Sequence, residues 1–368
     1  MITADPIHPW AYGAGYLYPA QYYRLARERL QPGGVMCQWV PAYELSLESF
    51  KSVVGTFAES FPYLTLWQAS NDMILVGSNS PIHVDVGVLA QRLAEPAVAR
   101  QLARVGLESA TSFLAGFVMD DPGVESWVEG AIVNTDDNLY LEFSSPLGIG
   151  APQLRGNLRS IEPYRTSPLA VVGDVSPLFA SVAEAEEVFG TYQWAKSRVV
   201  EAQLIRGSIE QSGGGVRRAA VLQRVNRQMR HVVRRLPEYA PARIELAAGL
   251  AQLGTAQLKS GRPHEAVRGC QEAVELAPEN ADCHRVLGMA MLQIGEYTGA
   301  VEHLETALDL RPRSWIAYYQ LAAALKLVER DGDALRVIQR GLAIKPGHAG
   351  METLLAHLRA VSADEVAP

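Results

Sequence analysis

The C-terminal third of the chain contains three similar stretches: HEAVRGCQEAVELAPEN (264–280), TGAVEHLETALDLRPRS (298–314) and GDALRVIQRGLAIKPGH (332–348). Each stretch carries a small residue near its start and a proline near its end. The positions that recur every 34 residues are Pro278, Pro312 and Pro346; Ala266, Ala300 and Ala334; Leu253, Leu287 and Leu321; and Gly254, Gly288 and Ala322. Because these positions keep their spacing over three copies, the sequence indicates an internal repeat.

This pattern resembles the tetratricopeptide repeat (TPR), in which each unit is a pair of antiparallel helices. Small residues let the paired helices approach closely, and the proline ends the second helix because it lacks an N–H group and clashes with the preceding turn. We place the repeats at 247–280, 281–314 and 315–348, followed by a cap helix and tail at 349–368. The resemblance implies an all-α TPR solenoid; the alternative is a generic helical bundle.

TPR arrays usually bind peptides or proteins in a concave groove lined by the first helix of each pair. The resemblance therefore implies an unidentified protein or peptide partner, and the alternative is a purely architectural solenoid. The residues expected to line the groove are Ala248, Ala251, Thr255, Leu258, Asp282, Arg285, Met289, Leu292, Ile316, Tyr319, Ala323 and Lys326. This lining is largely apolar and lacks the Lys/Asn set with which some TPR proteins bind a C-terminal carboxylate.

The composition of the chain is that of a folded protein. Its 368 residues suit two or three domains, and 48% of them are hydrophobic. The net charge of -7 gives no electrostatic reason to expect a nucleic-acid partner. No apolar run reaches the roughly 20 residues that span a bilayer, so direct membrane insertion is not expected. A cytoplasmic protein with free thiols at Cys37, Cys270 and Cys283 is the default expectation.

The N-terminal part of the chain alternates helices and strands. Apolar spacing and turn residues predict a helix at 20–30, a strand at 34–40, a helix at 46–60 that begins at Ser46, and strands at 63–69 and 72–78. The two strands are separated by two residues, which predicts a hairpin. This order is an α/β arrangement that ends in a hairpin.

The same region resembles the spermidine synthase family of aminopropyltransferases, in particular its longer fused forms. The segments that carry the resemblance are DPIHPW (5–10), GAG (13–15), LY (17–18), YY (22–23), PGGVMCQ (32–38), FPYLTLWQASNDMILVGS (61–78) and NTDDNLYLEFSSP (134–146). The resemblance implies part of a methyltransferase-like, Rossmann-type sheet. It also implies aminopropyl transfer from decarboxylated S-adenosylmethionine, as co-substrate, to an amine.

By this resemblance Asp5 is the carboxylate that attracts the protonated amine and takes a proton from it. Gln38, expected at the end of the next strand, would hydrogen-bond the amine, and Trp10 and Tyr18 would line its methylene chain. Polyamine synthases of the family usually carry a second acid where this chain has His8. A neutral imidazole does not supply that charge, so a diamine substrate is not implied.

The nucleotide-binding half of such a domain would lie upstream of Asp5, where the sequence reads MITA. We therefore expect only the C-terminal part of the catalytic domain, with no cofactor-binding residues assignable and no independent activity. A truncated gene product, a split enzyme completed by another chain, and an inert remnant are the three alternatives. The competing function is a non-catalytic TPR scaffold that carries a degenerate synthase remnant.

The expected organisation is a synthase-like α/β part at 1–80, a mixed helical and irregular extension at 81–176 and a helical connector at 177–246, ahead of the repeats at 247–348. Within the extension, Asp136, Asp137 and Glu142 lie close together in the sequence. They lack the glycine and spacing of an EF-hand loop, so no metal site is predicted. A turn followed by a strand at LYLEF (139–143) is the expected structure.

Overall fold

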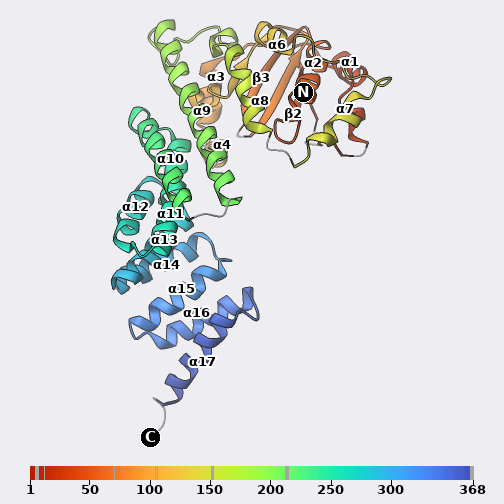
Figure 1. Cartoon of the computed structure of the whole chain (residues 1–368). Coiled ribbons are helices and arrows are strands. Elements are labelled where there is room, and N and C mark those ends of the chain that lie inside the picture. Colours follow the sequence, from red (N-terminus) through yellow and green to blue (C-terminus); the bar gives the residue numbers. More distant parts are fainter. Residues whose placement is uncertain are drawn as a thin grey trace. The chain divides into compact units, whose positions relative to one another are not determined.

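The computed structural model describes residues 1–4, 8–11, 13–69, 71–103, 105, 107–150, 153–211 and 215–364. The chain divides into two compact units, Met1–Glu201 and Ala202–Pro368. The first is a mixed α/β unit built around a small sheet, and the second is entirely helical (Figure 1).

The sheet of the first unit has five strands in the order β1-β2-β4-β3-β5. They are β1 (Ile2–Ala4), β2 (Val35–Pro41), β3 (Tyr63–Ala69), β4 (Asp72–Ser78) and β5 (Phe117–Met119). Strands β1 and β2 are parallel, with Ala4 opposite Gln38, and every other pairing is antiparallel. The predicted hairpin is confirmed: β3 and β4 pair along their whole length from Tyr63 opposite Ser78 to Ala69 opposite Asp72.

The helices of the first unit pack around this sheet. They are α1 (Ala20–Glu28), α2 (Leu47–Ala58), α3 (Val86–Leu93), α4 (Pro96–Ala103), α5 (Ala110–Leu114), α6 (Asp121–Val128), α7 (Tyr140–Ser144) and α8 (Leu154–Ile161). The predicted start of α2 is confirmed, because the Ser46 hydroxyl accepts a hydrogen bond from Ser49 N at 3.1 Å. Gly77 of β4 faces Phe57 and Phe61 at the end of α2, so one face of the sheet packs against this helix.

The extension after residue 80 is part of the same sheet and core. It contributes β5, which pairs with the outer edge of β3, and α6, whose buried Trp127 ring meets Phe50 of α2 at a centroid distance of 5.0 Å. The segment 139–143 is not the expected strand, because Tyr140–Ser144 form α7. The buried amide oxygen of Asn134 accepts a hydrogen bond from Leu141 N at 3.0 Å and so holds the first turn of this helix.

The second unit is a series of helical hairpins. The long helix α9 (Val182–Gln211) enters it, and α10 (Gly215–Arg235) packs against the first repeat helix. The following helices are α11 (Ala240–Lys259), α12 (Pro263–Leu276), α13 (Ala281–Ile294), α14 (Tyr297–Leu310), α15 (Trp315–Leu327), α16 (Asp331–Ile344) and α17 (Ala349–Asp364). Figure 1 shows α11 to α16 turning back on one another as three successive pairs.

The small residues of the repeat lie where paired helices touch. A Cβ at Gly254 would lie 2.6 Å from Cys270 Sγ, and a Cβ at Gly288 would lie 2.7 Å from Leu304 Cγ. The first helices therefore approach the second helices closely only because these positions carry no side chain. Burial between the helices raises the pKa of the Cys270 thiol to about 12, so this thiol stays protonated at neutral pH.

The first repeat helix is longer than its sequence register suggests. It begins at Ala240, seven residues before the start of the first repeat at 247, and has 20 residues against 14 in α13. Pro241 lies in its first turn, where a missing N–H costs no helical hydrogen bond. Among the helices formed by described residues, none combines the length and the apolar character needed to cross a membrane.

Candidate functional site

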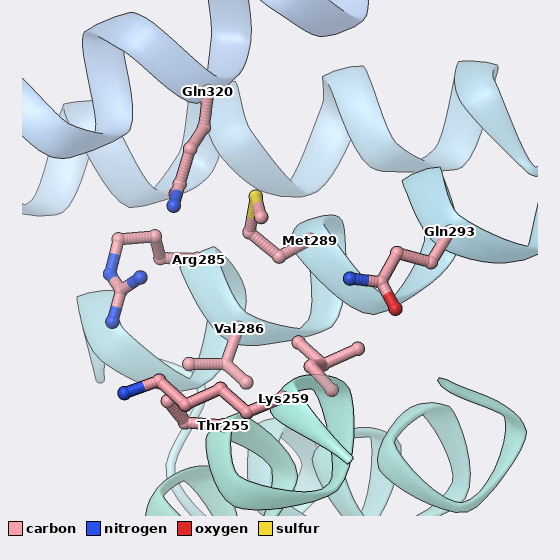
Figure 2. Close-up of a pocket in the computed structure, with 8 residues that line it drawn as sticks. Thr255, Lys259, Arg285, Val286, Met289, Gln293 and Gln320 are labelled. Atoms are coloured by element: carbon pink, nitrogen blue, oxygen red, sulfur yellow. The ribbon is translucent and has the colours of Figure 1, made fainter. Parts of the chain in front are cut away.

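The first helices of the three pairs line a pocket of about 260 Å³ (Figure 2). Its lining residues are Thr255, Leu258 and Lys259 of α11, Arg285, Val286, Met289 and Gln293 of α13, and Gln320 of α15. Figure 2 shows the nitrogen-bearing ends of Lys259, Arg285 and Gln320 on one side of the pocket, beside the apolar side chains of Val286 and Met289. The pocket thus has a polar side and an apolar centre.

A second pocket of about 240 Å³ shares Thr255, Arg285 and Val286 with the first. Its other lining residues are Arg206, Ala248, Ala251, Gln252, Asn280 and Asp282. Because the two pockets share three lining residues, they form one depression along α11 and α13. We call this depression, defined by the residues of both pockets, the concave groove.

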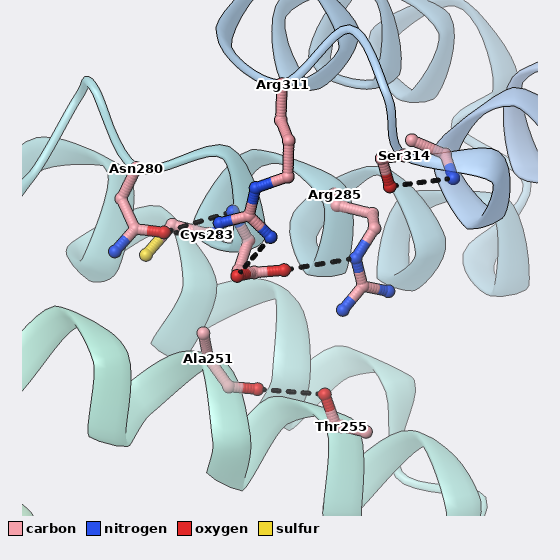
Figure 3. Close-up of polar contacts among 9 residues, drawn as sticks. Ala251, Thr255, Asn280, Cys283, Arg285, Arg311 and Ser314 are labelled. Carbon is pink, nitrogen blue, oxygen red and sulfur yellow. Dashed lines mark hydrogen bonds and ion pairs between the residues drawn. The ribbon is translucent and has the colours of Figure 1, made fainter.

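The polar groups at the start of α13 are held in place by local hydrogen bonds (Figure 3). The Asn280 side chain accepts from the N–H groups of Asp282 at 3.0 Å and Cys283 at 3.3 Å, which satisfies two donors of the first turn. The Asp282 carboxylate receives Arg311 Nη1 at 2.9 Å and Arg285 Nε at 3.5 Å. The stronger of the two ion pairs therefore belongs to Arg311.

The cations of the groove differ in how far they are neutralised. Arg206 forms two hydrogen bonds to Glu245, at 2.7 and 3.0 Å. Burial raises the pKa of the Glu245 carboxyl, and the contacts with Arg206 oppose that shift. In contrast, no ion pair within 4 Å joins Lys259 to a carboxylate of the described residues. The first pocket therefore presents Lys259 and Arg285 with no acid in its lining.

Seven of the twelve expected lining residues line the groove: Ala248, Ala251, Thr255, Leu258, Asp282, Arg285 and Met289. The other five, Leu292, Ile316, Tyr319, Ala323 and Lys326, line neither pocket. Sequence reasoning missed Arg206 and Asn280. It also missed five residues that each directly follow an expected lining position: Gln252, Lys259, Val286, Gln293 and Gln320. One residue along a helix is a turn of about 100°, so a wider helical stripe would have included them.

Two of the candidate residues of the N-terminal unit, His8 and Trp10, lie together. Asp5 lies outside the described residues. The His8 ring stacks on Trp10 at a centroid distance of 4.3 Å and meets the edge of Trp39 at 5.2 Å. Trp39 also hydrogen-bonds the Asp72 side chain. Burial raises the pKa of the Asp72 carboxyl, and the interactions with Trp39 and His8 only partly oppose that rise. Asp72, which the sequence analysis did not select, thus lies close to His8.

Gln38 and Tyr18 are both buried. Gln38 is not at the end of its strand, because β2 continues to Pro41. Gln38 pairs with Leu75, which lies two residues from Gly77 and so shares the face covered by α2, whereas the neighbouring Trp39 points to the opposite face. Burial raises the pKa of the Tyr18 hydroxyl far above its usual value. The amine-binding roles of these residues stay predictions.

The acids of the 134–142 segment have structural contacts. The Glu142 carboxylate accepts hydrogen bonds from Gly13 N at 3.3 Å and Gly15 N at 3.1 Å, and its closeness leaves no room for a Cβ on Gly15. Asp136 N donates to the Gln21 side chain at 3.2 Å. Among the described residues, no group of three or more His, Cys, Asp or Glu side chains could hold a metal ion. Through these hydrogen bonds the segment holds the 13–21 region in place.

A family model described as "Tetratricopeptide repeat" matches residues 257–325. The C-terminal region of this chain contains TPR repeats. The matched residues run from Gln257, near the end of α11, to near the end of α15. They include seven of the eight residues of the first pocket, all except Thr255. Part of the groove therefore lies within the TPR-matched helices.

Two curated proteins are similar to part of the chain. Superkiller complex protein 3 from Mus musculus is 31% identical over 86 residues, which are 23% of this chain and 6% of the relative. The Hsp70-Hsp90 organizing protein from Triticum aestivum is 28% identical over 110 residues, which are 30% of this chain and 19% of the relative. The chain spans less than a fifth of the length of either relative.

Solved structures also match part of the chain at low identity. A crystal structure of MamA is 20% identical with a TM-score of 0.34, and the match covers 41% of this chain and 86% of that chain. The second TPR domain of human RPAP3, in complex with an HSP70 peptide, is 20% identical with a TM-score of 0.30. That match covers 31% of this chain and 94% of that chain.

Proposed function

We propose that this chain is a non-catalytic TPR scaffold that holds an extended segment of a partner protein in the concave groove. The observation that carries the proposal is the joined pair of pockets along α11 and α13, with Gln320 of α15 at one wall. A groove that crosses successive helices suits an elongated ligand, whose side chains enter pockets along its length. The similarity to a protein named Hsp70-Hsp90 organizing protein also supports a protein-binding role.

The second helices of the pairs give the groove a rigid support. Ala266, Ala300 and Ala334 are fully buried against the first helices. The apolar cluster of the last repeat continues into α17 through Met351 and Leu358. A groove built on packed helices needs little rearrangement when a ligand binds, which favours affinity.

The proposal is tested by selecting random 12-residue peptides on the purified whole chain and measuring the binding of the selected peptides. Thr255→Tyr places a bulky side chain where the two pockets join and should weaken binding about tenfold or more, roughly 1.4 kcal/mol. Thr298→Tyr, on the exposed surface of α14, is the matched control and should bind normally. Equal binding by both variants contradicts a groove site.

A second candidate function is aminopropyl transfer from decarboxylated S-adenosylmethionine by the α/β unit, once a nucleotide-binding half is supplied by another chain. Its support is the strand order: β1, which precedes Asp5, lies parallel to β2, and the antiparallel hairpin follows on the other side of β2. The synthase resemblance implies the same succession along the chain: a strand before the acid loop, a next strand and a closing hairpin. Formation of methylthioadenosine from decarboxylated S-adenosylmethionine and putrescine, lost in Asp5→Asn, tests it.

A further inference from the structure

The charges of the first pocket point to the chemistry of the partner, on the basis that the groove binds a peptide as proposed above. Two cations, Lys259 and Arg285, line this pocket, and none of its lining residues is acidic. The chain as a whole carries a net charge of -7. A cationic site on an acidic protein is therefore a local feature and not the consequence of a basic surface.

Arg285 retains binding capacity for another carboxylate. Its only ion pair among the described residues is the 3.5 Å contact from Nε to Asp282 Oδ1, and Arg311 reaches the other oxygen of Asp282 at 2.9 Å. The contact to Asp282 uses the Nε atom of Arg285, and Figure 3 shows the two terminal nitrogens of Arg285 pointing away from that contact. These terminal nitrogens can donate two parallel hydrogen bonds to a carboxylate.

The same pocket offers an apolar surface and an amide donor. Leu258, Val286 and Met289 supply the apolar lining. Figure 2 shows the side-chain amide nitrogen of Gln320 directed into the pocket. An amide N–H donates, so this nitrogen can bind a backbone carbonyl of a ligand.

We propose that the partner is an extended protein segment with an internal Asp or Glu next to a large aliphatic residue. Arg285 and Lys259 bind the side-chain carboxylate, and the aliphatic side chain lies against Met289 and Leu258. The amide nitrogen of Gln320 donates a hydrogen bond to a backbone carbonyl of the segment. Charge complementarity selects this occupant over a basic or a wholly apolar segment.

The test uses the whole chain and 12-residue random peptides displayed through their C-termini, so that the peptides have no free C-terminal carboxylate. We expect the selected peptides to contain Asp or Glu within two residues of Leu, Ile or Met. Synthetic, amidated copies of them should bind about 10- to 100-fold more weakly to Arg285→Glu than to the natural chain, as expected for the loss of a charge-assisted hydrogen bond. Replacing the peptide acid with lysine should recover binding to Arg285→Glu.

Arg268→Glu is the control of matched charge, because Arg268 is exposed on α12, outside both pockets. It should leave peptide affinity unchanged, and circular dichroism should show the same helix content and melting for both variants. Selected peptides that lack acids, or acidic peptides that bind Arg285→Glu normally, would overturn the charge assignment. If such peptides still lose affinity for Thr255→Tyr, the groove function stands and only the partner chemistry is wrong.

Discussion

His284 of α13 and His303 of α14 form a hydrogen-bonded pair between two repeat helices. His284 Nε2 lies 2.9 Å from the carbonyl oxygen of Pro278, and the Nδ1 atoms of the two rings lie 3.1 Å apart. Because a carbonyl oxygen only accepts, Nε2 of His284 carries a proton. In the neutral pair, Nδ1 of His284 then accepts from Nδ1 of His303. Burial, and secondly the neighbouring His284, lower the pKa of His303.

This shift predicts a loss of stability in mild acid. The folded chain holds His303 at a lower pKa than the unfolded chain, so below about pH 6.5 the unfolded chain binds more protons. The free energy of unfolding is therefore greatest above that pH and falls as the pH drops. Urea unfolding at several pH values should show this slope, and His303→Gln, which keeps a donor but does not titrate, should reduce it. Equal slopes in the two proteins contradict the prediction.

The close approach of α13 and α14 at Gly288 predicts a large effect of one methyl group. A Cβ at this position would lie 2.7 Å from Leu304 Cγ and 3.0 Å from the carbonyl oxygen of Ala300. Gly288→Ala should lower the free energy of unfolding by about 1–3 kcal/mol. Gly332→Ala in α16, where a Cβ would meet no atom within 4 Å, should raise it by up to about 1 kcal/mol. Guanidinium unfolding measures both, and a similar result for the two variants would refute the steric explanation.

Among the structural elements, the short helix α7 depends on contacts with distant parts of the chain. Its Glu142 carboxylate binds the N–H groups of Gly13 and Gly15, about 130 residues away in sequence. Glu142→Ala should therefore speed hydrogen exchange of the amides at 13–18, measured by mass spectrometry, while exchange in α11 to α16 stays unchanged. Glu129→Ala, at an exposed position after α6, is the control. Unchanged exchange at 13–18 would show that Glu142 does not hold this region.

The same helix shows where sequence reasoning fails. The segment LYLEF alternates apolar and polar residues, which favours a strand, but the Asn134 side chain and the distant glycines fix it as a helix. The β3–β4 hairpin, in contrast, was predicted with its full strand limits. Its alternation agrees with its tertiary environment, because the buried face of both strands packs on α2. The alternation of apolar and polar residues predicts secondary structure correctly only where long-range contacts favour the same structure.

The sequence predicted those lining residues of the groove whose positions follow from the 34-residue repeat. The 34-residue period placed Thr255, Arg285 and Met289 in the groove, and they line it. It did not reveal that Arg311 forms an ion pair with Asp282, because that pair joins the two ends of one repeat and depends on side-chain conformation. The aromatic neighbours of His8 were missed for a similar reason: Trp39 and Tyr43 reach it from the strand β2 and the residues after it.

At the scale of the whole molecule, the two units carry different kinds of candidate site. The α/β unit (Met1–Glu201) holds the sheet with β1 and the His8 aromatic cluster, and the helical unit (Ala202–Pro368) holds the concave groove. The groove is the site that geometry, charge and family similarity support together. We therefore expect the chain to bind a partner segment along α11 and α13.

Photocrosslinking measures this contact directly. The photoreactive residue p-benzoylphenylalanine is placed at Gln293, which lines the groove, or at Arg268 on α12. Each protein is then irradiated with a labelled peptide selected on the whole chain. We predict that the peptide crosslinks to the Gln293 position and not to the Arg268 position, and that Thr255→Tyr removes the crosslink. Crosslinking from Arg268 alone, or equally from both positions, would contradict peptide binding in the groove.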